Sequence, residues 1–150
     1  MKAVQTLFVG VCLSLMCAVS WAEAPLEIDG ATTVGLDKAK SLYDEGAVFI
    51  DVRDRQSWSL GHIEGSVNLD FNNNEFSVLY LSEDLDRSTP IVFYTSSSLN
   101  IRSAMASFFA SNWGYSNVYY FRDGYYSWMA ADMPVTLKMA SRSEAAPSLN

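Results

Sequence analysis

The feature that most restricts the fold of this chain is a set of short, continuous apolar runs separated by helical segments. Three of these runs, over 47–52, 91–94 and 118–121, are rich in β-branched and aromatic residues. A strand that is apolar at almost every position is typical of a parallel sheet covered by helices on both faces. The sequence therefore predicts an α/β fold, a single small domain with a central parallel sheet and helices on both faces.

The segments between these runs carry helical patterns. Apolar residues at helical spacing predict a helix over 36–43 that stops at Gly46, and shorter helices are expected over 54–60 and 125–131. A short strand over 66–69 and a helix or turn over 76–85 complete the pattern. The clearest helix is amphipathic and ends at Gly114, and its apolar positions are Ile101, Ala104, Met105, Phe108, Phe109 and Trp113.

The first 22 residues have the pattern of a secretory signal peptide. Lys2 precedes 13 residues of apolar character over 7–19, and Ser20-Trp21-Ala22 then offers small residues at −3 and −1. A 13-residue helix is about 20 Å long, less than the ~30 Å hydrocarbon core of a bilayer. We therefore expect export and cleavage after Ala22, while an uncleaved membrane anchor stays open as the alternative.

Removal of this leader changes the chemistry available to the chain. Both cysteines, Cys12 and Cys17, lie in it, so the 128 residues 23–150 contain no thiol. With Lys2 gone, nine basic residues face 17 acidic ones, a net charge of −8 that argues against nucleic-acid and anionic-membrane surfaces. One histidine and no cysteine cannot make an ordinary zinc site, so no metal is expected. The domain is expected over 23–136, and the polar segment 137–150 is expected to be a flexible tail.

The segment after the run 91–94 is the best candidate site. In parallel α/β folds ligands bind where loops leave the carboxyl ends of the strands. This loop opens the amphipathic helix, so its backbone N–H groups and the helix dipole favour an anion. Arg102 is the only cation there, at a helix end where a positive charge does not help the helix. The candidate ligand-binding loop comprises Thr95, Ser96, Ser97, Ser98, Leu99, Asn100, Ile101, Arg102 and Ser103.

Three blocks in register resemble the rhodanese-like domain, over roughly residues 30–136. They are DVRDRQSWSLGHIEGS at 51–66, the strand 91–94 with the loop that ends in Arg102-Ser103-Ala104, and FRDGYYSWMAADMPV at 121–135. The resemblance implies a small α/β domain that handles sulfane sulfur and needs no cofactor. It also implies structural roles for the motif residues Asp51, Arg53, Gly61, His62, Gly124 and Trp128.

The chain departs from this family at the position that matters most for activity. Active members carry a persulfide on a cysteine at the start of the loop, and that position matches Thr95, or Ser97 when it is counted back from Arg102. A hydroxyl needs an adjacent base to attack and cannot form a persulfide, and nothing in the sequence places His62 beside either residue. We therefore expect no catalytic residue in the loop.

These observations predict an exported rhodanese-like pseudoenzyme, periplasmic if it shares the family's usual Gram-negative setting. Its expected ligand is a small oxyanion or sulfur compound in the loop, or a periplasmic protein partner at that face. No nucleic acid is expected, and no membrane after cleavage of the leader. Two alternatives stay open: a thiosulfate sulfurtransferase whose thiol comes from another protein, and a purely structural or regulatory protein.

Overall fold

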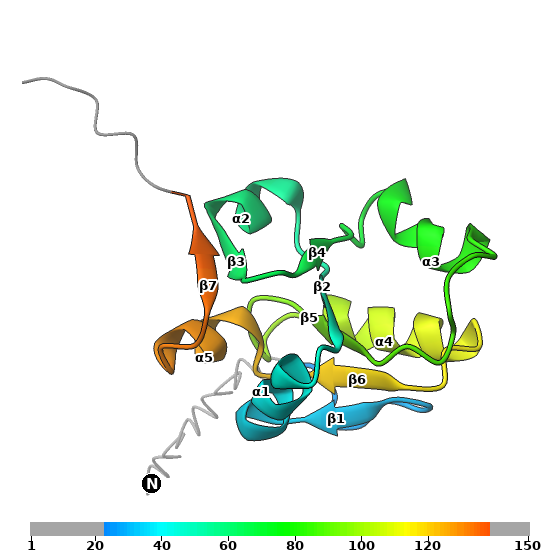
Figure 1. The fold of residues 1–150 in the computed structure, drawn as a ribbon, viewed down its shortest axis with the longest axis horizontal. Coiled ribbons are helices and arrows are strands. Elements are labelled where there is room, and N and C mark those ends of the chain that lie inside the picture. The colour runs from blue at the N-terminus through cyan, green and yellow to red at the C-terminus, as the bar shows by residue number, and fades with distance from the viewer. Residues whose placement is uncertain (1–22, 139–150) are drawn as a thin grey trace, which may run out of the picture.

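A five-stranded parallel sheet forms the centre of the molecule (Figure 1). The computed structural model describes residues 23–138. The sheet has the order β1-β6-β5-β2-β4, and a separate antiparallel pair joins β3 to β7. The strands are β1 Thr32–Val34, β2 Val48–Asp51, β3 Gly61–Ile63, β4 Val67–Asn68, β5 Ile91–Tyr94, β6 Val118–Phe121 and β7 Val135–Leu137. The α/β class and the central parallel sheet predicted from the sequence are confirmed.

Helices cover both faces of this sheet. They are α1 Leu36–Asp44, α2 Arg55–Leu60, the 3-10 helix η1 Asn74–Ser77, α3 Val78–Leu81, α4 Arg102–Asn112 and α5 Gly124–Ala130. One buried cluster packs α1 and α5 against the sheet, and a second packs η1, α3 and α4 against its other face. Over residues 23–138, no helix combines the length and the apolar character that crossing a bilayer requires.

Strand β5 shows how the apolar runs serve both clusters. All four of its residues are buried. Val92 and Tyr94 belong to the cluster with α1 and α5, whereas Ile91 and Phe93 belong to the cluster with α3 and α4. Side chains alternate between the two faces of a strand, so a strand between two helical layers must be apolar throughout. The continuous apolar run in the sequence therefore reports its central position in the sheet.

Helix α4 lies where the sequence predicts it, but the side chains that it buries are not the predicted ones. Its buried residues are small: Ser103, Ala104, Ala106, Ser107 and Ala110. The larger Ile101, Met105 and Phe108 are 54%, 39% and 44% exposed. The larger side chains between α4 and the sheet come from the strands: Phe93 and Val118 pack in the same buried cluster as Ala106 and Ala110 of the helix. Four of the apolar positions that predicted the helix, Ile101, Met105, Phe108 and Phe109, therefore do not form its core face.

The remaining differences concern short or distant pairings. The sequence did not predict β1, β3 or β7 as strands. Strand β7 includes Leu137, which pairs with Gly61, so the predicted tail 137–150 is wrong at its first residue. The predicted leader 1–22 and positions 139–150 lie outside the described residues.

Candidate functional site

Three loops leave the carboxyl edge of the sheet side by side. Strands β2, β5 and β6 are parallel neighbours, with Asp51 beside Tyr94 and Tyr94 beside Phe121 in the register. The residues that follow each strand must therefore meet at one edge. This edge receives all three sequence blocks, and the candidate loop 95–103, whose last two residues begin α4, is in the middle.

The first two residues of the candidate loop are fixed by helix α5. The carbonyl oxygen of Thr95 accepts a hydrogen bond from Tyr125 N at 2.8 Å, and that of Ser96 accepts one from Tyr126 N at 3.0 Å. Gly124, just before these donors, has a φ of +69°, and a Cβ there would lie 2.4 Å from the Thr95 carbonyl oxygen. Only glycine allows so close an approach with that backbone conformation. The motif glycine therefore joins α5 to the loop.

The middle of the loop leaves three backbone donors without an acceptor in the described structure. Asn100 N donates to Ser97 O at 3.1 Å, and Arg102 N donates to Asn100 Oδ1 at 3.0 Å. The backbone N–H groups of Ser96, Ser97 and Ser98 donate to no residue between 23 and 138. A run of such groups next to a helix N-terminus is a candidate site for an anion.

Arg102 adds a positive charge at this place. It is partly buried, and no ion pair within the described part of the chain involves it. The pKa of Asp54 is lowered mainly because its carboxylate accepts hydrogen bonds from Ser57 N and Ser57 Oγ, and the charge of Arg102 lowers it further. Arg102 therefore acts electrostatically on the turn that begins α2.

The two candidate nucleophile positions differ in exposure. Thr95 is fully buried, and its Oγ1 has no hydrogen-bond partner among the described residues. Ser97 is partly exposed, and its Oγ accepts a weak hydrogen bond from Leu99 N at 3.4 Å. At the other end of the loop, Ser103 Oγ is also buried without a partner in the described structure. The loop thus has an unsatisfied hydroxyl at each end.

A buried ion pair supports the loop from strand β2. Arg53 Nη2 donates to Asp51 Oδ2 at 2.6 Å and to Gly61 O at 2.7 Å, and its guanidinium lies 4.4 Å from the ring centre of Tyr125. Burial alone would lower the pKa of Arg53, but the hydrogen bonds and charge of Asp51 outweigh it and raise this pKa. Asn68 Nδ2 donates to the carbonyl oxygens of both Asp51 and Arg53, at 3.0 and 2.9 Å. This network fixes the turn after β2.

Gly61 and His62 belong to the scaffold that this network holds. A Cβ at Gly61 would lie 2.4 Å from Tyr125 Oη. His62 Nδ1 donates to Trp58 O at 2.8 Å, and the two rings stack with their centres 4.0 Å apart. His62 makes no hydrogen bond to Thr95 or Ser97, all three being described residues. Trp128, the last motif residue, is fully buried and donates from Nε1 to Pro134 O at 2.9 Å.

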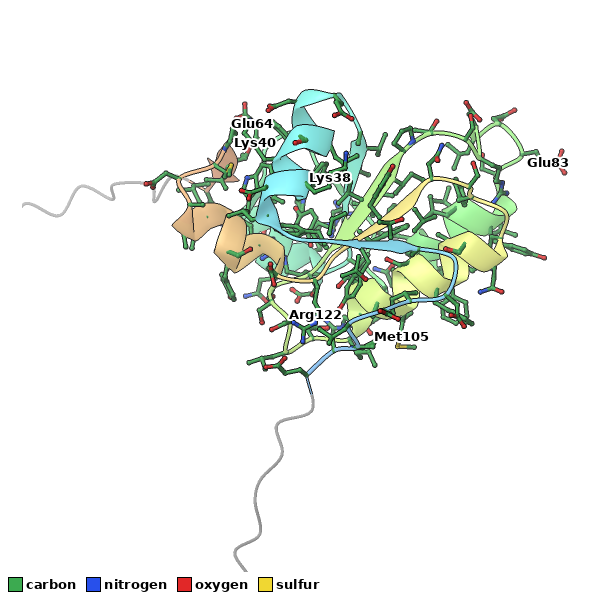
Figure 2. The ribbon with its side chains drawn as sticks, turned by 90° about the horizontal axis from the view of Figure 1, so that it is seen from below. Lys38, Lys40, Glu64, Glu83, Met105 and Arg122 are labelled. Carbon is green, nitrogen blue, oxygen red and sulfur yellow. The ribbon has the colours of Figure 1, made fainter. Side chains whose placement is uncertain are left out.

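The structure adds two site residues that the sequence reasoning missed. Ala24 is only 4% exposed, and its N–H donates to Ser98 O at 2.7 Å. Arg122 Nε donates to Ala24 O at 3.1 Å, while Arg122 Nη2 donates to Glu23 Oε2 at 2.5 Å. Figure 2 shows Arg122 beside the start of the described chain. No sequence pattern signals a contact across 98 positions, so only the fold reveals it.

Comparisons with known proteins agree with this architecture. A family model described as the rhodanese-like domain matches residues 36–131. A thiosulfate sulfurtransferase GlpE of Pseudomonas entomophila is 36% identical over 92 residues, which is 61% of this chain and 79% of the relative. The human single-domain sulfurtransferase TSTD1 is similar in structure, with a TM-score of 0.59 and 24% identity over 67% of this chain and 96% of that one.

A more distant structure has the same fold. The polysulfide-sulfur transferase homodimer of Wolinella succinogenes has a TM-score of 0.61 at 18% identity, over 77% of this chain and 85% of that one. The family model alone spans well over half of the chain. Together with the identity to GlpE, this establishes that the chain belongs to the rhodanese-like domain family of sulfurtransferases.

Proposed function

We propose that this chain is an exported, periplasmic member of its family that binds a small oxyanion, such as sulfate or thiosulfate, in the loop 95–103. Export is proposed from the pattern of residues 1–22. Anion binding depends on one observation: the N–H groups of Ser96, Ser97 and Ser98 lie beside the α4 N-terminus and have no acceptor in the described structure. Arg102 supplies the positive charge at the same end of the helix. A tetrahedral dianion matches both the donors and the charge.

The expected affinity is modest. Each charge-assisted hydrogen bond contributes about 1.5–3 kcal/mol before other costs. Desolvation of the anion opposes binding, and so does the net charge of −8 expected for residues 23–150. We therefore expect a Kd on the order of 1 mM, which corresponds to about −4 kcal/mol.

We further propose that the chain alone does not transfer sulfur. A persulfide requires a thiolate, and residues 23–150 contain no cysteine. The hydroxyls of Thr95 and Ser97 cannot replace it, because they would need a base, and His62 makes no hydrogen bond to either hydroxyl in the described structure. The chain would then keep the ability to bind an anion but lack the nucleophile that sulfur transfer requires.

Anion binding is tested by NMR titration of the purified protein with sodium sulfate and sodium thiosulfate. We expect backbone amide shifts concentrated in residues 95–104. Arg102→Ala is expected to remove them with little loss of thermal stability, because the side chain makes no ion pair in the described part of the chain. Lys38→Ala is the matched control, since it removes one positive charge from an exposed position on α1. Absence of shifts at tens of millimolar anion would contradict the proposal.

Sulfur transfer is tested separately with thiosulfate and cyanide. We expect no thiocyanate above the uncatalysed background. Thiocyanate that persists through repurification would show that the chain is itself a sulfurtransferase. Activity that appears only with an added protein thiol would support the alternative in which a partner supplies the nucleophile.

A further inference from the structure

The outer face of helix α4 forms one wall of an apolar groove of about 410 Å³. The opposite wall is the extended segment 25–29, which runs past α4 below the sheet, and Met105 points toward it from the helix (Figure 2). Besides Ala104, the apolar lining residues are Pro25, Ile28, Ile101, Met105, Phe108 and Phe109. We name this feature the α4 groove.

Three apolar side chains of the α4 groove, Ile101, Met105 and Phe108, belong to neither buried cluster. The opposite face of α4 already packs against the sheet through Ala106 and Ala110. Ile101, Met105 and Phe108 instead stand at positions i, i+4 and i+7, all more than one third exposed. They span about 10 Å along the helix, which is two turns. Contiguous apolar surface of this kind marks an interaction site, and the spacing suits a second helix laid along the first.

Two carboxylates at the α4 groove favour an occupant with positive charge. Glu27 and Asp29 line the groove, are exposed, and pair with no basic residue within 23–138. An occupant with Lys or Arg beside its apolar stripe would neutralise both. A second copy of this acidic chain would instead bring the same two carboxylates toward each other, and an anionic membrane would be repelled.

We propose that the α4 groove docks an amphipathic helix of a partner protein, with an apolar stripe at i, i+4 and i+7 flanked by basic residues. This docking face is separate from the anion-binding donors of Ser96–Ser98. It meets the loop at Ile101, so a docked partner would lie directly beside the mouth of the loop. The proposal stands whether or not the loop binds anions.

The probe is a synthetic 18-residue helical peptide with leucines at i, i+4, i+7 and i+11 and lysines on both flanks. A second peptide carries glutamates in place of the lysines. We expect the purified protein to bind the basic peptide at least tenfold more tightly, in titrations followed by the shifts of α4 amides. The affinity should fall as salt increases, because the two carboxylates are exposed.

Variants localise the binding to the groove. Phe108→Ser and Met105→Gln are each expected to weaken the basic peptide about tenfold or more, whereas Leu81→Ser, an exposed apolar residue on α3, is the matched control. Glu27→Gln combined with Asp29→Asn should remove most of the salt dependence. Glu83→Gln combined with Asp84→Asn controls for the loss of two charges; both residues are exposed, and Figure 2 labels Glu83 at the far end of the molecule. Thermal melts of each variant establish that it is folded.

Three outcomes would overturn this assignment. Equal binding of the two peptides would show that the carboxylates do not select the occupant. Unchanged binding by both Phe108→Ser and Met105→Gln would place the peptide elsewhere. A dimer in sedimentation equilibrium that Phe108→Ser dissociates would make a second copy the occupant. None of these results depends on the sulfate titration, so failure of the loop proposal is distinguishable from failure of this one.

Discussion

Thr95 is one of the two residues that match the position of the family's catalytic cysteine, and it carries a hydroxyl in place of the thiol. It directly follows strand β5, it is fully buried, and its carbonyl oxygen is held by Tyr125 N. If Thr95 holds the family's nucleophile position, Thr95→Cys is expected to give weak thiosulfate–cyanide activity, because the new thiol would start the loop whose N–H groups at 96–98 have no acceptor in the described structure. Ser97→Cys is expected to stay inactive.

The pair of variants also tests how the loop aligns with the family. Activity in Ser97→Cys but not in Thr95→Cys would show that the nucleophile position is two residues further along the chain. Alkylation of each new thiol with iodoacetamide provides the control, because activity that survives it cannot come from the introduced cysteine.

At the scale of elements, the candidate ligand-binding loop depends on its contact with helix α5. Gly124→Ala would place a methyl group 2.4 Å from Thr95 O at a backbone φ of +69°, so the loop or the helix must move. We expect a loss of about 2–3 kcal/mol in the free energy of unfolding and loss of the sulfate-induced shifts. Chemical denaturation and the NMR titration measure the two effects.

Gly114→Ala is the control for Gly124→Ala, because it introduces strain in the backbone without a steric clash. Gly114 has a φ of +91°, but no atom lies within 4 Å of a Cβ built there. We expect this variant to lose only about 1 kcal/mol from strain and to keep the sulfate response. Equal effects of the two substitutions would show that the contact between α5 and the loop does not organise the site.

The elements also show what the sequence could and could not predict. Strands β5 and β6 were predicted with correct bounds, because central parallel strands are apolar at almost every position. Strands β3 and β7 were missed, since their pairing joins Gly61 to Leu137 and neither segment has a strand pattern of its own. The face of α4 was misjudged for a related reason: Phe93 and Val118 on the sheet decide how much volume the helix must supply.

For the candidate site, the sequence predicted the position of the loop but not the long-range contacts that hold it. The loop 95–103 follows from a buried strand that leads into a helix, and the structure places it at the carboxyl edge of the sheet. The contribution of Ala24 was invisible, because its bonds to Ser98 and Arg122 depend on long-range folding alone.

For the molecule as a whole, buried tyrosines predict an alkaline limit to stability. Burial raises the pKa of Tyr94 well above its ordinary value, with the charge of Asp51 adding to the shift, and burial likewise raises the pKa of Tyr120 and Tyr125. The folded state therefore holds these protons more tightly than the unfolded state. Their contribution is complete below about pH 10, the unfolded value, and is lost as pH rises beyond it.

Tyr94→Phe tests this prediction. The variant should lose about 1 kcal/mol at neutral pH, because Ile63 N and Ser66 Oγ lose the hydroxyl that they contact. Above pH 10 its stability should fall less steeply than that of the wild type in urea titrations. An unchanged slope would mean that other groups control the alkaline transition.

Export is the other prediction at this scale. Cleavage after Ala22 would make Glu23 the first residue, with its carboxylate on Arg122 and the next N–H on Ser98 O. Cleavage after Ala24 would remove both contacts. Mass spectrometry of the protein from the exported fraction should therefore show a chain that begins at Glu23, whereas a full-length chain in the membrane fraction would support an anchor.

If the leader is cleaved after Ala22, the bonds of Ala24 would make maturation part of the assembly of the candidate site. A protein trimmed two residues too far would keep its sheet and both cores, yet Ser98 would lose its amide donor and Arg122 its two acceptors. The freed guanidinium and the loosened loop would change anion affinity without changing the fold. If the loop binds anions as proposed, its affinity would show how accurately the leader is removed, and a recombinant chain would need Glu23 and Ala24 to reproduce the proposed site.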